Sequence, residues 1–85
     1  MNIREANRIR KTFLYKACLY RLYRIKNGLF SAPYESGTFI LWSYQTRPPE
    51  LASPQILDAF ESTLTLEEKA YTVDMVKEVF PDVKF

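Results

Sequence analysis

The spacing of apolar residues predicts an amphipathic helix at the start of the chain. With 100° of rotation per residue, an arc of about 140° holds six apolar side chains: Ile3, Ala6, Ile9, Phe13, Leu14 and Ala17. Arg4, Arg8 and Lys11 lie on the opposite side. The pattern breaks after Cys18, because the same helix continued would place Arg21 on the apolar face. We therefore expect the structure to change near residue 18.

Two interpretations of residues 19–26 are open. In the first, which we favour, this segment is a strand that turns at Asn27-Gly28, a dipeptide suited to a two-residue hairpin. In the second, the helix continues to Lys26, Gly28 is its left-handed cap, and Leu29 packs back on the last turn. The first interpretation adds a strand to the sheet that the middle of the chain predicts.

The middle of the chain has the composition of a strand. Residues 38–45 are rich in β-branched and aromatic side chains, follow Gly37 and precede Pro48-Pro49. The preceding segment, residues 29–34, is extended by a proline and separated from it by a turn-like Glu35-Ser36-Gly37. The two segments are expected to pair in an antiparallel sheet of two or three strands.

Capping signals predict two helices in the last third. Ser53 is a suitable N-cap for a helix over Pro54–Ser62, with a proline at its first position, after a stiff connector at residues 48–50. Thr65 and Glu68 form a capping box for the next helix, which Pro81 stops. Its apolar face is expected to hold four residues: Ala70, Val73, Val76 and Phe80.

These elements predict an α+β fold. It consists of an N-terminal amphipathic helix, a small two- or three-stranded antiparallel sheet and two C-terminal helices. A chain of 85 residues buries only about 60–65% of its unfolded surface and supports one core, so we expect residues 1–85 to form a single small domain.

Charge is divided unevenly along the chain. Residues 1–30 carry eight cationic side chains and one carboxylate, a net charge of +7, whereas residues 31–85 carry a net charge of −5. The overall charge of +2 therefore hides a dipolar molecule, and such asymmetry is typical of a protein with a charged partner.

Catalytic and metal-binding patterns are missing from the sequence. There is no histidine, which removes the usual base, proton shuttle and zinc ligand, and the two glycines stand singly, so no phosphate loop is formed. The carboxylate pairs Asp58/Glu61 and Asp74/Glu78 have the spacing of an ordinary solvated helix surface. We predict a protein that is not an enzyme and that needs no metal or cofactor.

Cysteine usage and hydropathy bear on the compartment. Cys18 is the only cysteine and lies among apolar residues, which predicts a buried thiol and a cytoplasmic or other reducing compartment. The Arg-rich start also resembles an organelle-targeting segment, but its apolar residues look like core residues, so we expect it to be retained. The longest apolar run, residues 39–42, is too short to span a membrane.

The leading functional hypothesis is binding of RNA or another nucleic acid by the basic first third. Cations that alternate with tyrosines can pair with phosphates while the rings stack on bases. The residues predicted to do this are Arg8, Lys11, Lys16, Arg21 and Arg24, with Tyr20 and Tyr23 for stacking. The competing interpretation is that the tyrosines pack in the core and that the cations compensate the acidic C-terminal helices.

The rival hypothesis is a protein-binding inhibitor or a small structural subunit of an assembly. Both faces of the predicted central strand carry large apolar groups, so one face is expected to contact a partner or a second copy, with Trp42 and Tyr44 as anchors. The last helix adds an acidic surface for a basic protein partner: Glu67, Glu68, Asp74 and Glu78.

The tripeptide Leu-Tyr-Arg stands twice in succession, at Leu19-Tyr20-Arg21 and Leu22-Tyr23-Arg24. It resembles the tripeptide that names a family of small mitochondrial adaptor proteins, and this resemblance implies a bundle that is helical throughout. The resemblance covers six residues, and the extended segment expected at residues 37–46 contradicts such a bundle. We therefore assign the chain to no family on this ground.

Overall fold

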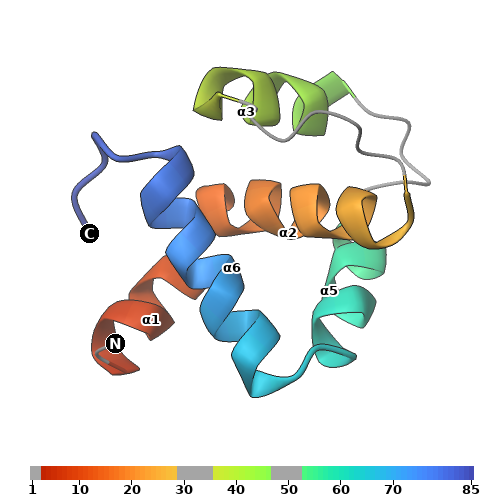
Figure 1. Ribbon diagram of the computed structural model, residues 1–85, viewed down its shortest axis with the longest axis horizontal. Helices are drawn as coiled ribbons and strands as arrows, with labels where there is room; N and C mark the ends of the chain where they lie inside the picture. Colours follow the sequence, from red (N-terminus) through yellow and green to blue (C-terminus); the bar gives the residue numbers. More distant parts are fainter. Residues whose placement is uncertain (1–2, 29–35, 47–52) are drawn as a thin grey trace.

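The computed structural model describes residues 3–28, 36–46 and 53–85. These residues form helices and no strand (Figure 1). The helices are α1 (Ile3–Arg10), α2 (Phe13–Lys26), α3 (Gly37–Thr46), α5 (Pro54–Ser62) and α6 (Leu66–Val79). The prediction of an α+β fold with a small antiparallel sheet is therefore wrong, because the described part of the chain is all helical.

The N-terminal helix is shorter than the apolar pattern predicts. It ends at Arg10, and a new helix begins at Phe13, so the break lies before residue 18. Thr12 causes it: its hydroxyl accepts a hydrogen bond from the backbone N–H of Tyr15 and donates one to the carbonyl of Ile9. A threonine in this position caps the second helix and lets the first turn away from it.

Residues 19–26 are helical, as the second interpretation predicts, and the strand that we favoured is wrong. Helix α2 continues to Lys26, and Gly28 follows in the left-handed region with φ of 68°. The amphipathic pattern fails here because α2 contacts all the other described helices and so needs no polar face. Cys18, Leu19 and Tyr20 are consecutive and all buried.

The predicted strand over residues 38–45 is the helix α3. Ser36 begins it, since its hydroxyl accepts from the backbone N–H of Phe39. The buried positions are Ile40, Ser43 and Tyr44, a spacing of three and four residues that only a helix places on one side. Strand propensity depends on pairing with a neighbour. The expected partner strand (residues 29–34), the contact of Leu29 and the connector at residues 48–50 lie outside the described residues.

Both C-terminal helices are confirmed. Helix α5 spans Pro54–Ser62, and the Ser53 hydroxyl accepts from the backbone N–H of Ile56. Helix α6 opens with the predicted capping box, in which Thr65 and Glu68 exchange side-chain and backbone hydrogen bonds. It ends at Val79, shortly before Pro81.

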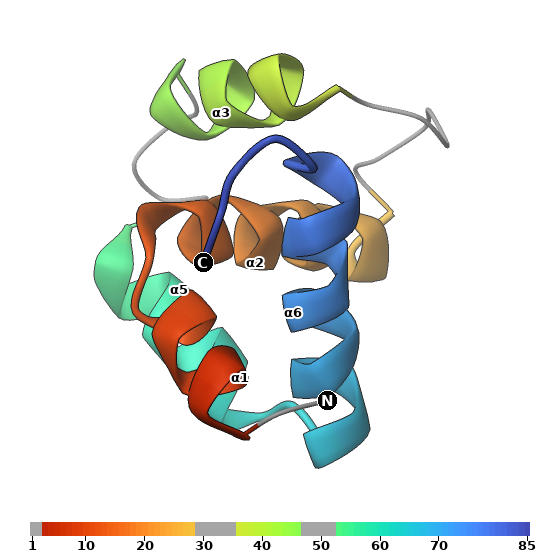
Figure 2. The ribbon, with the colours of Figure 1, turned by 90° about the vertical axis from the view of Figure 1, so that its left-hand side faces the viewer.

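Helix α2 lies at the centre of the molecule. In both views α3 covers one side of it, while α1, α5 and most of α6 lie on the other (Figures 1 and 2). The core follows α2 and takes side chains from every described helix, with Ile9, Leu57 and Val76 fully buried. Gly37 lets α3 approach the end of α6, because a Cβ there would lie 2.8 Å from both the Phe80 ring and the Val79 carbonyl oxygen.

Two sequence-based expectations bear on this fold. The objection to the adaptor resemblance rested on an extended segment at residues 37–46 and no longer holds, although the resemblance still covers only six residues of α2. In the described part of the chain, no helix has both the length and the apolarity needed to cross a membrane.

Candidate functional site

The cations of the basic segment form ion pairs with carboxylates of the C-terminal half. Lys16 of α2 pairs with Asp58 of α5, and Lys26 at the end of α2 pairs with Glu68 of α6. Arg10 of α1 lies 3.5 Å from Glu61 of α5. A fourth pair, Lys77 with Glu5, joins α6 back to α1. The two oppositely charged parts of the sequence therefore neutralise each other in part within the fold.

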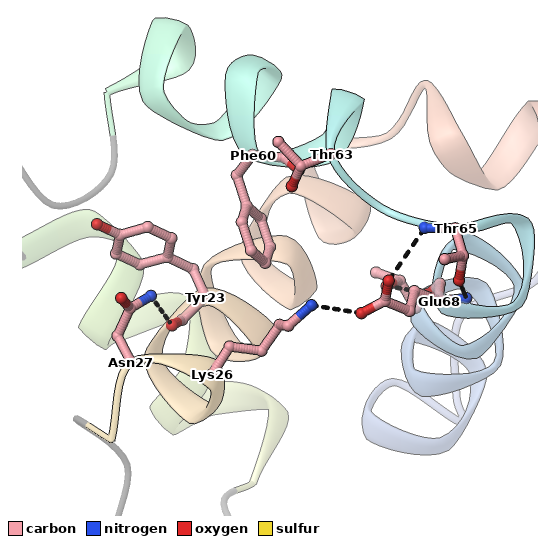
Figure 3. Close-up of polar contacts among 8 residues, drawn as sticks. Tyr23, Lys26, Asn27, Phe60, Thr63, Thr65 and Glu68 are labelled. Atoms are coloured by element: carbon pink, nitrogen blue, oxygen red, sulfur yellow. Dashed lines mark hydrogen bonds and ion pairs between the residues drawn. The ribbon is translucent and has the colours of Figure 1, made fainter.

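The Lys26–Glu68 pair is the most elaborate of these contacts (Figure 3). Glu68 accepts from the Lys26 ammonium and from the backbone N–H of Thr65, and these bonds, Lys26 first, hold the pKa of Glu68 below its ordinary value. The ammonium also lies 5.9 Å from the centre of the Phe60 ring, whose edge-on partner is Tyr23 at 5.3 Å. The predicted stacking residue Tyr23 thus packs, half-buried, between helices.

Two predicted phosphate contacts, Arg21 and Arg24, are engaged inside the molecule. Arg21 donates to the Met75 sulfur at 3.3 Å, and its Nε is buried without a hydrogen-bond partner. Arg24 donates to the Ser43 hydroxyl at 3.1 Å and lies 5.5 Å from the ring centre of Tyr20. Both side chains are half-buried, so their charges are directed at neighbouring helices rather than at solvent.

The remaining nucleic-acid candidates do not form one surface. Tyr20 is buried beneath α3 and contacts Tyr44 at a ring distance of 5.8 Å, so its face is not open to a base. Arg8 and Lys11 are exposed. Of the seven residues that the sequence predicted, these two cations alone combine exposure with charge. Nucleic-acid binding stays a prediction, without the joint cationic and aromatic surface on which it was based.

The aromatic anchors of the rival hypothesis are separated by the fold. Tyr44 faces inward and is held by Phe13 at 5.0 Å, whereas Trp42 is 58% exposed. The neighbour of Trp42 on the outside of α3 is Phe39, which is 41% exposed and lies 5.8 Å away. Phe39 was not predicted with Trp42 because a strand places these two residues on opposite faces, whereas the helical spacing of three residues brings them together.

The acidic residues of the last helix are also divided. Glu67, Asp74 and Glu78 are exposed along one stripe of α6, because spacings of seven and four residues return to the same helix face. Glu68 lies on another face and pairs with Lys26. Tyr71, which is 54% exposed, lies in the middle of the stripe and was not predicted as part of it.

The thiol and the paired carboxylates are the other groups whose chemistry was considered from the sequence. Cys18 is fully buried, as predicted, and burial raises the pKa of its thiol to about 12. The predicted carboxylate pair Asp58/Glu61 is divided between two cations, Lys16 and Arg10. No group of three or more potential metal ligands occurs within the described ranges.

Comparison with known proteins finds no match, whether against family models, curated proteins or solved structures.

Proposed function

We propose that this chain is a non-enzymatic protein-binding module that docks on a larger protein through the outer face of α3. The observation that carries the proposal is the exposure of Trp42 beside Phe39 on a helix without a single charged residue. The partner is expected to offer an uncharged apolar surface that accepts the two rings.

The composition of α3 supports this proposal. Its ten residues hold no acidic or basic side chain, although charged residues make up 26% of the chain. The helix packs on α2, with Ile40 and Tyr44 buried, whereas Phe39 and Trp42 are exposed. The solvent side of a surface helix is normally polar and charged, whereas the exposed side of α3 carries two large aromatic rings and no charge. The uncovered side is therefore the natural contact for another protein.

The rings themselves have the properties of interface anchors. Tryptophan dominates the binding energy of many interfaces, where it fills a desolvated pocket. Contacts between Tyr44 and both Phe13 and Tyr20 hold α3 in place from beneath. Phe39 and Trp42 are thus presented on a supported helix, which lowers the entropic cost of ordering them on binding.

RNA binding ranks behind this proposal. The basic segment owes its predicted affinity to many cations acting together, because each phosphate contact adds to the counterion release. Lys16 and Lys26 are committed to internal ion pairs, and Arg24 to Ser43 and Tyr20. Arg8 and Lys11 are the predicted cations that stay exposed.

The proposal is tested by recovering the protein from its native cell after nuclease treatment. The variant carries Phe39→Gln and Trp42→Gln, and the matched control is Tyr71→Gln, which removes an equally exposed aromatic ring from another helix. We expect the wild type and the control to retain the same discrete protein partner and the double variant to lose it. Circular dichroism should show the same helix content for all three, because the replaced side chains are exposed.

Two outcomes contradict the proposal. One is retention of the same partner by the double variant; the other is recovery of no protein by the nuclease-treated wild type. Trp42 is the only tryptophan, so its fluorescence gives a second readout. Emission should shift to shorter wavelength when the purified partner covers the ring.

A further inference from the structure

A second apolar surface lies between α1 and the first half of α6. It is a groove of about 250 Å³ with Ala6, Ala70 and Val73 among its lining residues. Ile3 and Leu66 also line it and are 77% and 84% exposed, more than any other large apolar side chain in the described ranges. Such a groove can accept a large apolar side chain from another molecule.

Cations complete the lining of the groove. Arg10 and Lys69 belong to it, and no carboxylate of the described residues lies within ion-pair distance of Lys69. Among the described residues, Arg10 has one ion pair, the 3.5 Å contact with Glu61. Charge complementarity therefore favours an occupant that brings an apolar side chain flanked by carboxylates.

The chain itself carries a surface of this description. The acidic stripe of α6 consists of Glu67, Tyr71, Asp74 and Glu78, and spacings of four, three and four residues keep them within an arc of about 60°. Tyr71 supplies an exposed ring, and carboxylates precede and follow it along the helix.

The groove and the stripe lie on neighbouring faces of the same helix. Each of three groove residues, Leu66, Ala70 and Val73, directly precedes a residue of the stripe, so the two faces are about 100° apart. When two copies meet with their α6 helices antiparallel about a two-fold axis, the stripe of each copy crosses the groove of the other. A contact of this kind is self-complementary and closes at two copies.

We propose that the chain forms a two-fold homodimer in which Tyr71 and the acidic stripe of α6 in each copy occupy the α1–α6 groove of the other copy. This surface is separate from the outer face of α3, so the homodimer does not depend on the proposed function. A standard interface takes about 800 Å² from each partner, and the chain, whose surface is 5566 Å², is large enough to supply this area from one face. We expect a reversible dimer that weakens with salt, because exposed charges are screened.

Sedimentation equilibrium over a range of concentrations tests the dimer through a charge exchange. The wild type should pass from 10.0 kDa to twice this mass as concentration rises. One variant reverses the stripe with Glu67→Lys and Asp74→Lys, and the other reverses the groove with Lys69→Glu. Each variant alone should stay at 10.0 kDa. An equimolar mixture should recover the dimer, because both cross-contacts then regain attraction between opposite charges.

The recovery in the mixture separates a lost contact from a misfolded chain. A wild type that stays monomeric at all concentrations overturns the proposal, even if an acidic segment of another protein occupies the groove. A dimer that survives both reversals, or that is lost in the Phe39→Gln, Trp42→Gln variant instead, overturns it as well and assigns the contact to another face. Tyr71→Gln should weaken the dimer at least tenfold in dissociation constant, as expected for an aromatic anchor.

Discussion

At the scale of single residues, burial leaves the hydroxyl of Tyr15 without a full hydrogen-bond partner. Tyr15 is 1% exposed, and its hydroxyl is buried without a hydrogen bond of standard geometry. Burial raises the pKa of this hydroxyl most, and the hydrogen-bonding interaction with the neighbouring Glu61 and then the charge of that carboxylate raise it further. A buried hydroxyl without a hydrogen-bond partner lowers the stability of the folded state more than an apolar group at the same position does. The ring of Tyr15 packs in the core, whereas its oxygen has no hydrogen-bond partner of standard geometry there.

Replacement of Tyr15 by phenylalanine is therefore expected to stabilise the protein. The free energy of unfolding should rise by about 1 kcal/mol, because the buried oxygen loses water without gaining a full partner. Urea denaturation followed by circular dichroism measures it, with Tyr71→Phe as the exposed control that should change nothing. A loss of stability in the Tyr15 variant would show that the hydroxyl has a strong partner.

Glu68 makes stability depend on pH. Its pKa is lowered in the folded state, first by the hydrogen bond from Lys26, so its contribution is present above the ordinary pKa of 4.5 and is lost as pH falls through the lower folded value. Glu68→Gln removes the charge and keeps an acceptor for the capping box. We expect this variant to lose less stability than the wild type on acidification below pH 4.5, whereas Glu67→Gln should follow the wild type. Thermal melting across this range decides between them.

At the scale of helices, the sequence predicts a helix correctly where capping residues at its own ends determine where it begins. The Ser53 cap and the Thr65/Glu68 capping box are local, and both helices appear where they predict. Helices α2 and α3 depend on what surrounds them. Helix α2 has neighbours on several sides and so lacks a polar face, and α3 has no charged residue on any side, so neither shows the periodicity of a surface helix.

The contact between α3 and the end of α6 makes a prediction about Gly37. Alanine is normally preferred to glycine in a helix by about 1 kcal/mol. Here the added Cβ would meet a ring carbon of Phe80 and the Val79 carbonyl oxygen at 2.8 Å, and the backbone oxygen cannot move cheaply. Gly37→Ala should therefore lower the free energy of unfolding by about 1–3 kcal/mol, as overpacking does.

Gly28→Ala is the comparison for Gly37→Ala. A Cβ added at Gly28 would meet nothing within 4 Å, so the substitution lowers the free energy of unfolding only through the left-handed backbone at φ of 68°. That cost is about 1–2 kcal/mol. Trp42 fluorescence should change in the Gly37 variant alone, because α3 is displaced there. A Gly37 variant as stable as the wild type, with unchanged fluorescence, would contradict the close approach.

At the scale of the whole molecule, cations of the basic first third form ion pairs with carboxylates of the acidic remainder of the chain. The basic first third was predicted to bind an acidic partner, and carboxylates of α5 and α6 supply part of that partner. The sequence alone could not reveal this, since Lys16 and Asp58 are 42 residues apart and only the fold brings them together. It could indicate the exposed aromatic surface only in part: Trp42 was named, and Phe39 was missed because the segment was taken for a strand.

Photo-crosslinking from the outer face of α3 tests the central claim most directly. A photoreactive amino acid replaces Phe39 in one protein and Tyr71 in a second, and both are irradiated in the native cell. The account predicts that position 39 yields an adduct with one discrete larger protein, while position 71 yields an adduct with a second copy of this chain and none with that larger protein. Adducts of position 39 with nucleic acid, or no adduct from it at all, would contradict the account.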